Sequence, residues 1–500
     1  MLNFSSPSKH FPAPRTRNPR PTMYPLQGRC VVWGVGTGLI GVSLFSSPLV
    51  GFAVLAFFLV VGALWRRDEP PILTFCLALQ WLFVVFGYFY QEVTGRSPTG
   101  PPGDFDGAVF LSLVGLLVIV AGVRSALKLL EPWLLSERGK QTRSAHSYDL
   151  RRLFCYVILA YSVSWVVEVQ PTELAFAIAG FISHSLAFRG VLLCLLFLAI
   201  LRQQTGYGYG AIAGMFVLLP ESTSMFAAWS GVLFLPLILL LGECKLWSKS
   251  ISDRRRNIRI ALAATGTVVS LFVMGLTWQG GVKNTWRSEL KRGAARATPI
   301  EKMRTLVSVV EEVLSEMDWN KAFESLAERL SGSFYFSHVL LHVPDMMPHE
   351  NGGLTMRALE HTFKPRFLFP DKPDLGSNSR LVSKYTGFYV AGEESETSIG
   401  FSYMAEFYID FWRIGMFVPL FLWGFIVGLV YGAVFLVSPS HHFAYAAVTV
   451  MLLQPFASYE GEIAYLLAGL AQVFIVFGLL LYFIGPWLHR KLLVRSQLRS

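Results

Sequence analysis

The chain has 500 residues, of which 53% are hydrophobic and 15% are charged. Soluble domains contain about 25% charged residues, so this composition excludes an ordinary soluble protein and indicates a membrane protein. The formal net charge of +10 does not indicate nucleic-acid binding, because the basic residues cluster beside long apolar runs, as the positive-inside rule requires. The five cysteines form no CxxC pair, so we expect neither a disulfide framework nor a thiolate metal site.

Residues 1–29 contain several prolines and basic side chains, and we expect them to form a disordered cytoplasmic arm. Twelve apolar runs follow, and a helix needs about 20 residues to cross the hydrocarbon core of a membrane. The runs are residues 30–46, 48–65, 71–90, 107–123, 152–169, 173–201, 206–220, 223–242, 258–278, 413–437, 443–458 and 463–486. The sequence lacks the short alternating segments of a transmembrane barrel. The predicted fold is therefore an all-α polytopic membrane protein with about 12 transmembrane helices.

Basic residues beside these runs predict the topology. The connections at 66–67, 124–152 and 254–256 are rich in Lys and Arg, whereas those at 91–107 and 457–462 are poor in them. By the positive-inside rule, this pattern predicts an even number of spans with both termini in the cytoplasm. The predicted organisation is a transmembrane bundle over 30–278, a large periplasmic loop over 279–412, three further spans over 413–486 and a basic cytoplasmic tail over 487–500.

The run at 173–201 is the least regular of the twelve. It is too long for a perpendicular helix and contains His184 and Arg189, so it is tilted, broken or composed of two short segments. A buried cation is costly within a membrane, which makes Arg189 a candidate functional residue. The alternative is that the run divides into two segments and leaves Arg189 at a membrane interface.

The periplasmic loop is the only large polar region, and we expect it to contain short amphipathic helices. Residues 298–317 and 320–332 carry apolar side chains at helical spacing, which predicts two such helices against the membrane surface or over the bundle. Residues 343–400 are rich in Pro, Gly, Asn and aromatics, which favours ordered loop over helix. The chain has no Walker-type nucleotide loop, HExxH motif or EF-hand loop, so no cofactor is expected.

Two stretches of this loop bring cations to the membrane boundary. Lys283 and Arg287 follow the ninth run and are four residues apart, so on a helix they share one face. The proline-rich stretch "FKPRFLFPDKPDLGSNSR" (363–380) adds further cations, among them Arg366 and Lys372. Such side chains suit a lipid-linked phosphate or diphosphate. The alternative is a surface that binds anionic lipids.

Acidic and aromatic residues precede the tenth run in "MAEFYIDFWR" (404–413). Glu406 is a candidate general base, because a carboxylate near a basic site can accept a proton from a substrate hydroxyl. Asp410 is a weaker candidate, since it is three residues from Arg413 and the two side chains can simply pair.

Three segments carry a resemblance to a known family: "VKNTWR" after the ninth run, "FKPRFLFPDKP" in the loop, and "SIGFSYMAEFYIDFWRIGMFVPLFLWGFIVG" entering the tenth run. Over roughly residues 280–430 the chain resembles the bacterial oligosaccharide repeat-unit polymerases, the O-antigen polymerase family. The resemblance implies a membrane-embedded glycosyltransferase of the bacterial inner membrane. It would polymerise undecaprenyl-diphosphate-linked repeat units into O-antigen, capsule or exopolysaccharide on the periplasmic face, without a cofactor.

The resemblance places Arg366 and Lys372 in one matched motif and Lys283 and Arg287 in another. We expect these four residues, with Arg189, to bind the substrate diphosphate. Glu406 is the first candidate for the general base and His361 is the second. Tyr385, Tyr389 and Tyr408 are candidate sugar-binding residues, with core packing as the alternative for each.

Three other functions remain open at this point, one of which is a non-enzymatic membrane subunit of a polysaccharide assembly complex. An O-antigen-ligase-like enzyme would transfer the glycan to lipid A, and a transporter or flippase would move lipid-linked glycans across the membrane. The large loop between the ninth and tenth runs does not fit the two matched halves of many transporters. The expected partners are the lipid-linked oligosaccharides and membrane lipids, with a chain-length regulator and a flippase as further candidates.

Overall fold

The computed structural model describes residues 28–45, 47–66, 69–101, 103–141, 148–169, 185–222, 229–243, 251–292, 299–364, 369, 378–390 and 400–494. These residues are almost entirely helical, and the pairing of Tyr148 with Leu493 is an isolated β-bridge among them. The prediction of an all-α protein is therefore confirmed for the part of the chain that the structure describes.

Helices occupy most of the predicted apolar runs in the first half of the chain. They are α1 (Gly28–Phe45), α2 (Pro48–Leu64), α3 (Ile72–Thr94), α4 (Phe105–Gln141), α5 (Leu150–Val169), α8 (Arg189–Gln203), α9 (Tyr207–Ser222), α10 (Trp229–Glu243) and α11 (Ile251–Thr277). Of the run at 173–201 the structure describes residues 185–201, where Phe188 keeps helical dihedral angles (φ −60°, ψ −23°) just before α8, and residues 170–184, including His184, lie outside the described residues.

The second half contains short helices followed by long apolar ones. They are η1 (Trp278–Val282), α12 (Lys283–Arg292), α13 (Pro299–Glu316), α14 (Trp319–Arg329), α15 (Ser333–His342), α16 (Gly353–Phe363), α17 (Asn378–Thr386), α18 (Tyr403–Gly415), α19 (Phe417–Val437), α20 (His441–Ala457), α21 (Ile463–Phe483) and α22 (Gly485–Leu492). The two predicted amphipathic helices are present as α13 and α14.

The prediction of loop over 343–400 is wrong for α16 and α17. On α16, Leu354 and Ala358 are four residues apart and both are buried, as expected for one face of a helix packed on the bundle. On α17, Val382 and Tyr385 are fully buried. Many of the prolines and glycines that favoured a loop lie in the sequence between these two helices. The composition of the whole segment therefore did not indicate the two short stretches with helical spacing.

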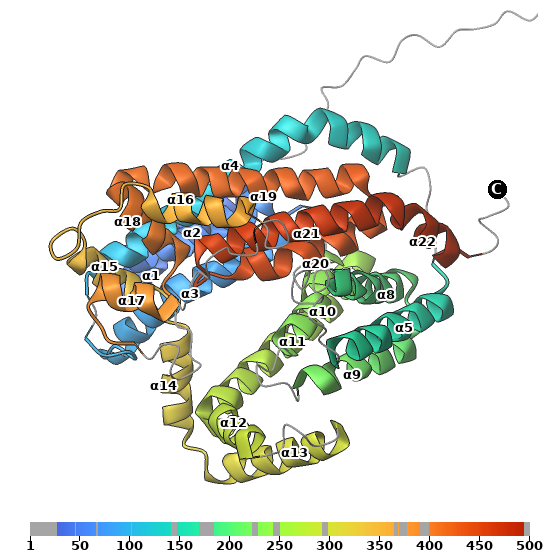
Figure 1. Ribbon diagram of the computed structural model, residues 1–500, viewed down its shortest axis with the longest axis horizontal. Helices are drawn as coiled ribbons and strands as arrows, with labels where there is room; N and C mark the ends of the chain where they lie inside the picture. Colours follow the sequence, from blue (N-terminus) through green and yellow to red (C-terminus); the bar gives the residue numbers. More distant parts are fainter. Residues whose placement is uncertain are drawn as a thin grey trace, which may run out of the picture.

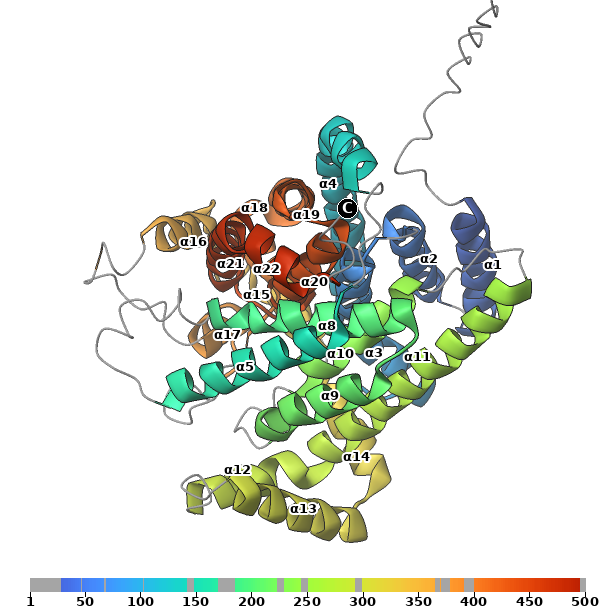
Figure 2. The same ribbon diagram turned by 90° about the vertical axis from the view of Figure 1, so that its right-hand side faces the viewer.

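Seven segments among the described residues are long and apolar enough to cross a membrane. They are Gly28–Phe45, Ile72–Thr94, Phe105–Ser136, Ser185–Gln203, Asn257–Arg292, Phe417–Val437 and Ile463–Phe483. Figure 2 looks almost along α19 and α21 and shows α5, α8 and α9 crossing that direction. The apolar runs therefore do not form one parallel bundle. The structure supports a polytopic helical membrane protein, while the count of twelve spans stays a prediction.

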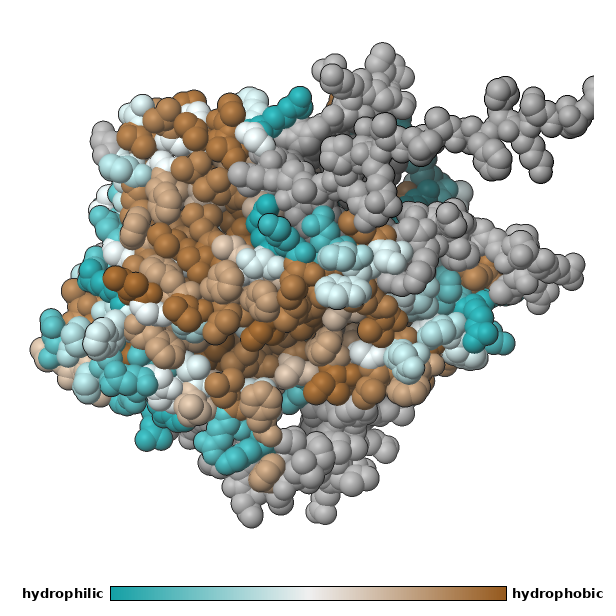
Figure 3. All heavy atoms as spheres, turned by 90° about the horizontal axis from the view of Figure 1, so that it is seen from above, coloured by the Kyte–Doolittle hydropathy of each residue, from teal (hydrophilic) through white to brown (hydrophobic). Residues whose placement is uncertain are grey.

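The centre of the bundle is the close packing of α4 against α19. A Cβ atom on Gly424 would lie 2.2 Å from the carbonyl oxygen of Ile119, and one on Gly122 would lie 2.2 Å from that of Phe421. Only glycine allows the two backbones to approach this closely, as at many helix interfaces within membranes. On the outer side, α19 exposes apolar side chains such as Leu422. Figure 3 shows that apolar side chains cover much of one face of the molecule.

The short helices α15, α17 and α18 gather at one end of the bundle, while α22 lies at the other (Figure 1). The helix α16 packs along α21 near the same end as α18. A separate small core of Val282, Trp286, Leu290 and Val309 joins α12 to α13. This arm extends away from the bundle and connects to it through α14 (Figure 1).

Candidate functional site

The short helix α18 forms the buried centre of the end where the loop helices gather. Its first turn is capped by Ser402, whose hydroxyl accepts a hydrogen bond from the backbone N–H of Ala405 at 3.3 Å. Tyr403 donates to Gln80 Oε1 at 2.6 Å, and Gln80 Nε2 donates to the Phe456 carbonyl oxygen at 2.6 Å. These bonds attach the start of α18 to α3 and to the end of α20, so its following side chains have fixed positions.

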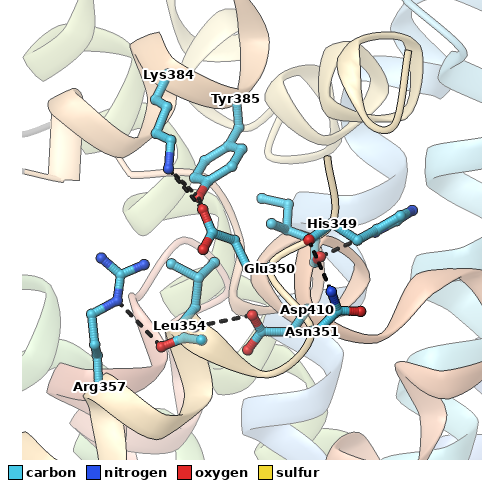
Figure 4. A network of polar contacts seen from close by, with 10 residues as sticks. His349, Glu350, Asn351, Leu354, Arg357, Lys384, Tyr385 and Asp410 are labelled. Atoms are coloured by element: carbon cyan, nitrogen blue, oxygen red, sulfur yellow. Dashed lines mark hydrogen bonds and ion pairs between the residues drawn. The ribbon is translucent and has the colours of Figure 1, made fainter. Parts of the chain in front are cut away.

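Asp410 holds the beginning of α16 (Figure 4). Its carboxylate accepts hydrogen bonds from the backbone N–H groups of Leu354 at 3.0 Å and Thr355 at 2.7 Å, and from the Thr355 hydroxyl at 2.6 Å. The residue that precedes α16 is Gly352, whose φ of 90° suits glycine and which has no side chain to cap the helix. Asp410 supplies the missing acceptor, and its negative charge also complements the helix dipole.

The pairing of Asp410 with Arg413 that the sequence left open is not the arrangement found. The Arg413 guanidinium instead lies 3.8 Å from the Asp104 carboxylate. Since Trp412 turns the chain with φ 62° and ψ −176°, Arg413 no longer follows the helical face that carries Asp410.

Glu406 lies one helical turn before Asp410 and is bonded to a different helix. Its Oε1 atom accepts a hydrogen bond from the backbone N–H of Ile463, the first residue of α21, at 3.1 Å. The side chain is 3% exposed. Burial raises the pKa of Glu406 well above its ordinary value, and the nearby charge of Glu462 adds to this increase. Burial therefore favours the protonated form of Glu406, whereas the general-base role predicted for it uses the ionised form, and that role stays a prediction.

Glu462 is the second carboxyl group at the start of α21. It occupies the N-cap position, but its side chain makes no capping hydrogen bond. It is half-buried, and this burial raises its pKa to about 7, while the positive charge of Arg357 on α16 acts in the opposite direction. Two carboxyl groups, both with a raised pKa, therefore lie at this helix end.

A second polar network joins the loop before α16 to α17 (Figure 4). The Lys384 ammonium donates to Glu350 Oε1 at 2.7 Å and lies 2.8 Å from the Tyr385 hydroxyl, which also donates to Glu350. Hydrogen bonds from Lys384 and Tyr385 lower the pKa of Glu350. Tyr385 is fully buried and its ring packs edge-on near Phe401, which favours core packing over sugar binding for this residue.

The loop before α16 is also tied to α18. The backbone N–H of Glu350 donates to the Ile409 carbonyl oxygen at 3.0 Å, and His349 Nδ1 lies 3.0 Å from the same oxygen. The Tyr408 hydroxyl donates to the Val343 carbonyl oxygen at 2.9 Å. Because the Tyr408 side chain is 3% exposed, this position too favours a core role.

The remaining predicted residues of this end differ in accessibility. Tyr389 is 87% exposed and so is open to a ligand. His361 is half-buried in the last turn of α16. Arg366 and Lys372 lie outside the described residues, in the segment between α16 and α17.

The predicted cations of the post-span segment lie together on α12. Lys283 and Arg287 are one turn apart there, and Arg329, at the end of α14, lies within electrostatic range of Lys283. Arg329 is ion-paired with Glu460, in the same short connection as Glu462. Arg329 thus links the cations of α12 and α14 to the α20–α21 connection that carries Glu462.

Arg189 is separate from these groups. It begins α8, and its guanidinium lies 4.9 Å from the centre of the Tyr161 ring. Figure 1 shows α8 well away from α18. Arg189 lies near the start of the apolar segment Ser185–Gln203, and the division of the run at 173–201 into two segments stays a prediction.

The fold and this site define a polytopic helical membrane protein in which short loop helices enclose carboxyl groups at one end of an apolar helix. Residues 137–433 match the model of DUF8712, a domain of unknown function. The match covers more than half of the chain, so the chain belongs to the DUF8712 family. The comparisons with curated proteins and with solved structures give no match.

Sequence reasoning missed several residues of this site, notably Glu350, Arg357 and Glu462. Glu462 immediately precedes an apolar run, and an acidic residue at that position is a signal for the start of a helix, so its place at the start of α21 could have been predicted. Glu350 and Arg357 carried no comparable signal, because their segment was expected to be a loop.

Proposed function

We propose that the protein is a membrane-embedded glycosyltransferase that uses polyprenyl-diphosphate-linked oligosaccharides as donors. It would join repeat units into a longer polysaccharide on the periplasmic face of the bacterial inner membrane, with both chain termini in the cytoplasm. The observation that carries the proposal is the gathering of α16, α17 and α18 around Glu406 and Glu462 at the start of the apolar helix α21. A lipid-linked substrate needs such a site, where the polar headgroup and the membrane-embedded chain are both accommodated.

The proposed reaction needs three kinds of assistance from the protein. The acceptor hydroxyl must lose a proton, the two substrates must be aligned, and the negative charge on the departing diphosphate must be stabilised. A carboxyl of the Glu406–Glu462 pair can supply the first. The energy for transfer is already present in the bond between the sugar and the diphosphate.

Basic residues from two parts of the loop are assigned to the diphosphate. Arg366 and Lys372 are assigned by the resemblance of their motif, and Lys283 and Arg287 by their position on one turn of α12. Arg forks match phosphate oxygens in two places at once, whereas Lys contributes a point charge. Arg189 is not included, because α8 lies away from α18 (Figure 1).

The test is a reconstitution with a single class of substrate. Purified protein in lipid nanodiscs would receive only polyprenyl-diphosphate-linked repeat units, and the products would be separated by length on a gel. A ladder of lengths is the expected result. Unchanged single units in the presence of folded protein would refute the proposal. Transfer that occurs only after addition of lipid A would refute polymerisation in favour of a ligase.

The same assay tests the assigned cations. Arg366→Ala and Lys372→Ala should abolish the ladder while leaving the amount of folded protein unchanged. Arg292→Ala and Lys321→Ala are matched controls, because both side chains are exposed and pair only locally with Glu289 and Asp318 among the described residues. Long chains from both of the first two variants would show that these residues do not bind the diphosphate.

A further inference from the structure

The acidic side chains around α18 differ in whether they have a partner. Glu350 is bonded to Lys384 and Tyr385, Glu406 to Ile463, Asp410 to Leu354 and Thr355, and Glu460 to Arg329. In the part of the chain that the structure describes, no hydrogen bond or ion pair is made by the carboxyl group of Glu462. A half-buried carboxyl that serves no structural partner remains available to a ligand.

Glu462 occupies the N-cap position of α21 but does not cap the helix. An N-cap side chain ordinarily accepts a hydrogen bond from the backbone N–H of the second or third residue of its own helix, and Glu462 makes no such bond. The N–H of the first helical residue, Ile463, is bonded to Glu406, which reaches it from α18. Glu406 therefore holds this helix end, while the Glu462 carboxyl is not bonded to its own helix.

We propose that Glu462 is the proton acceptor of the glycosyl-transfer site and that Glu406 is its buried neighbour, fixed by the hydrogen bond to Ile463. This inference rests on the proposed function. It assigns the general-base role to Glu462 in place of Glu406, which the sequence favoured. The assignment follows from contacts, because Glu406 is buried and bonded while Glu462 is half-buried and unbonded within the described residues.

The step balances as follows. The acceptor hydroxyl oxygen forms a bond to the anomeric carbon of the donor sugar, and the bond from that carbon to the diphosphate oxygen breaks with its electron pair. The hydroxyl proton moves to the carboxylate of Glu462, which later releases it to water. Polyprenyl diphosphate leaves with the negative charge, which the assigned cations stabilise.

The electrostatic surroundings support this role. A general base works best when its pKa lies near the working pH, and the pKa of Glu462 is raised to about 7 by burial.

Other charged or titratable groups face this site from the elements packed around it. They are Arg357 on α16, Glu406 and Asp410 on α18, and the ion pair of Glu460 in the α20–α21 connection with Arg329 on α14. Of these, Arg357 acts most directly on Glu462, because its positive charge favours the ionised form.

A titration that does not depend on activity tests the protonation states. Infrared difference spectra of protein in nanodiscs would follow the carboxylic-acid C=O band from pH 5 to pH 9. Wild type should lose one such group as the pH rises through about 7, and Glu462→Gln should lack this transition while Glu406→Gln retains it. A transition near neutral pH that persists in Glu462→Gln would overturn the proposal.

The polymerisation assay tests the catalytic role. Glu462→Gln should lower the rate about 100-fold or more, the range typical of removing a general base. Glu462→Asp should recover part of the rate, and Glu311→Gln, an exposed control on α13, should behave as wild type. In Arg357→Ala the rise of activity with pH should move to higher pH, since the cation that favours ionisation is lost. A ladder from Glu462→Gln with the wild-type rate and pH profile would overturn the role of Glu462, whereas no ladder from wild type would refute the proposed function itself.

Discussion

Asp410 and Thr355 are joined by two hydrogen bonds, one from the Thr355 backbone N–H at 2.7 Å and one from its hydroxyl at 2.6 Å. A third bond, from the backbone N–H of Leu354, ends on the same carboxylate. Because Asp410 is 1% exposed, water cannot replace it as acceptor. The capping of the first turn of α16 therefore depends on this side chain.

Replacing Asp410 should destabilise the protein. Asp410→Ala leaves two backbone N–H groups without their acceptor, and we expect the free energy of unfolding to fall by about 2 kcal/mol. Asp410→Asn keeps an acceptor but loses the charge, so it should be affected less. Chemical denaturation in detergent, followed by circular dichroism, measures both changes. Thr355→Ser retains the hydroxyl and serves as the control; equal stability of Asp410→Ala and wild type would contradict the capping role.

The network of Glu350, Lys384 and Tyr385 should make stability depend on pH under acidic conditions. The pKa of Glu350 is lowered in the folded state, so its contribution is present above its ordinary pKa of 4.5 and is lost as the pH falls through the lower folded value. The melting temperature of wild type should therefore fall between about pH 5 and pH 3. Glu350→Gln should show a smaller fall, since it has no proton to bind. An unchanged pH dependence in this variant would exclude Glu350 as a source.

Glu406 should make the stability of the folded protein depend on pH in the opposite direction from Glu350, and Glu406→Gln tests this. The pKa of Glu406 is raised in the folded state, so the protonated side chain favours folding fully below its ordinary pKa, and this advantage is lost as the pH rises through the folded pKa. The uncharged amide keeps an oxygen for the Ile463 N–H but avoids the buried charge. Glu406→Gln should therefore match wild type near pH 5 and be more stable at high pH. Glu406→Ala should be less stable at every pH, because Ile463 loses its acceptor.

The packing of α4 on α19 predicts a strong effect of one added methyl group. Gly424→Ala places a Cβ atom 2.2 Å from the Ile119 carbonyl oxygen, which is too close for any non-bonded contact. Forced separation of the helices should lower the free energy of unfolding by about 1–3 kcal/mol. Gly478→Ala on α21 is the matched control, since no atom lies within 4 Å of its added Cβ. That control should be neutral or stabilising by up to about 1 kcal/mol, because alanine favours helix over glycine. Equal melting temperatures for the two variants would contradict the close packing.

Features that depend on neighbours along the chain could be predicted from the sequence. The apolar periodicity of residues 298–317 predicted the helix observed as α13, and the four-residue spacing of Lys283 and Arg287 placed both on one turn of α12. Helical spacing is a local property, so no knowledge of the fold was needed for these inferences.

The carboxyl network could not be predicted in the same way. Asp410 and Leu354 are separated by 56 residues, and Glu406 and Ile463 by 57. Arg413 is three residues from Asp410 in the sequence, which made it a candidate partner. Because the chain turns at Trp412, Arg413 lies near Asp104 instead, and Asp410 binds the start of α16. The burial of Glu406 could not be predicted either, because it is set by the packing of α18 against its neighbours and not by the sequence of α18 itself.

Glu406 and Asp410 are four residues apart, so they lie on the same face of α18, and each binds the start of another helix. One turn of α18 therefore holds the first residues of both α21 and α16, so the position of one helix start cannot change without affecting the other. Inserting a single residue between the two acids would rotate one of them by about 100° around the helix axis, away from the N–H groups that it serves. A one-residue insertion in α18 should therefore lower the stability of the protein more than a longer insertion in the surface loops. It would break the hydrogen bonds to the start of either α16 or α21 while keeping those to the other helix.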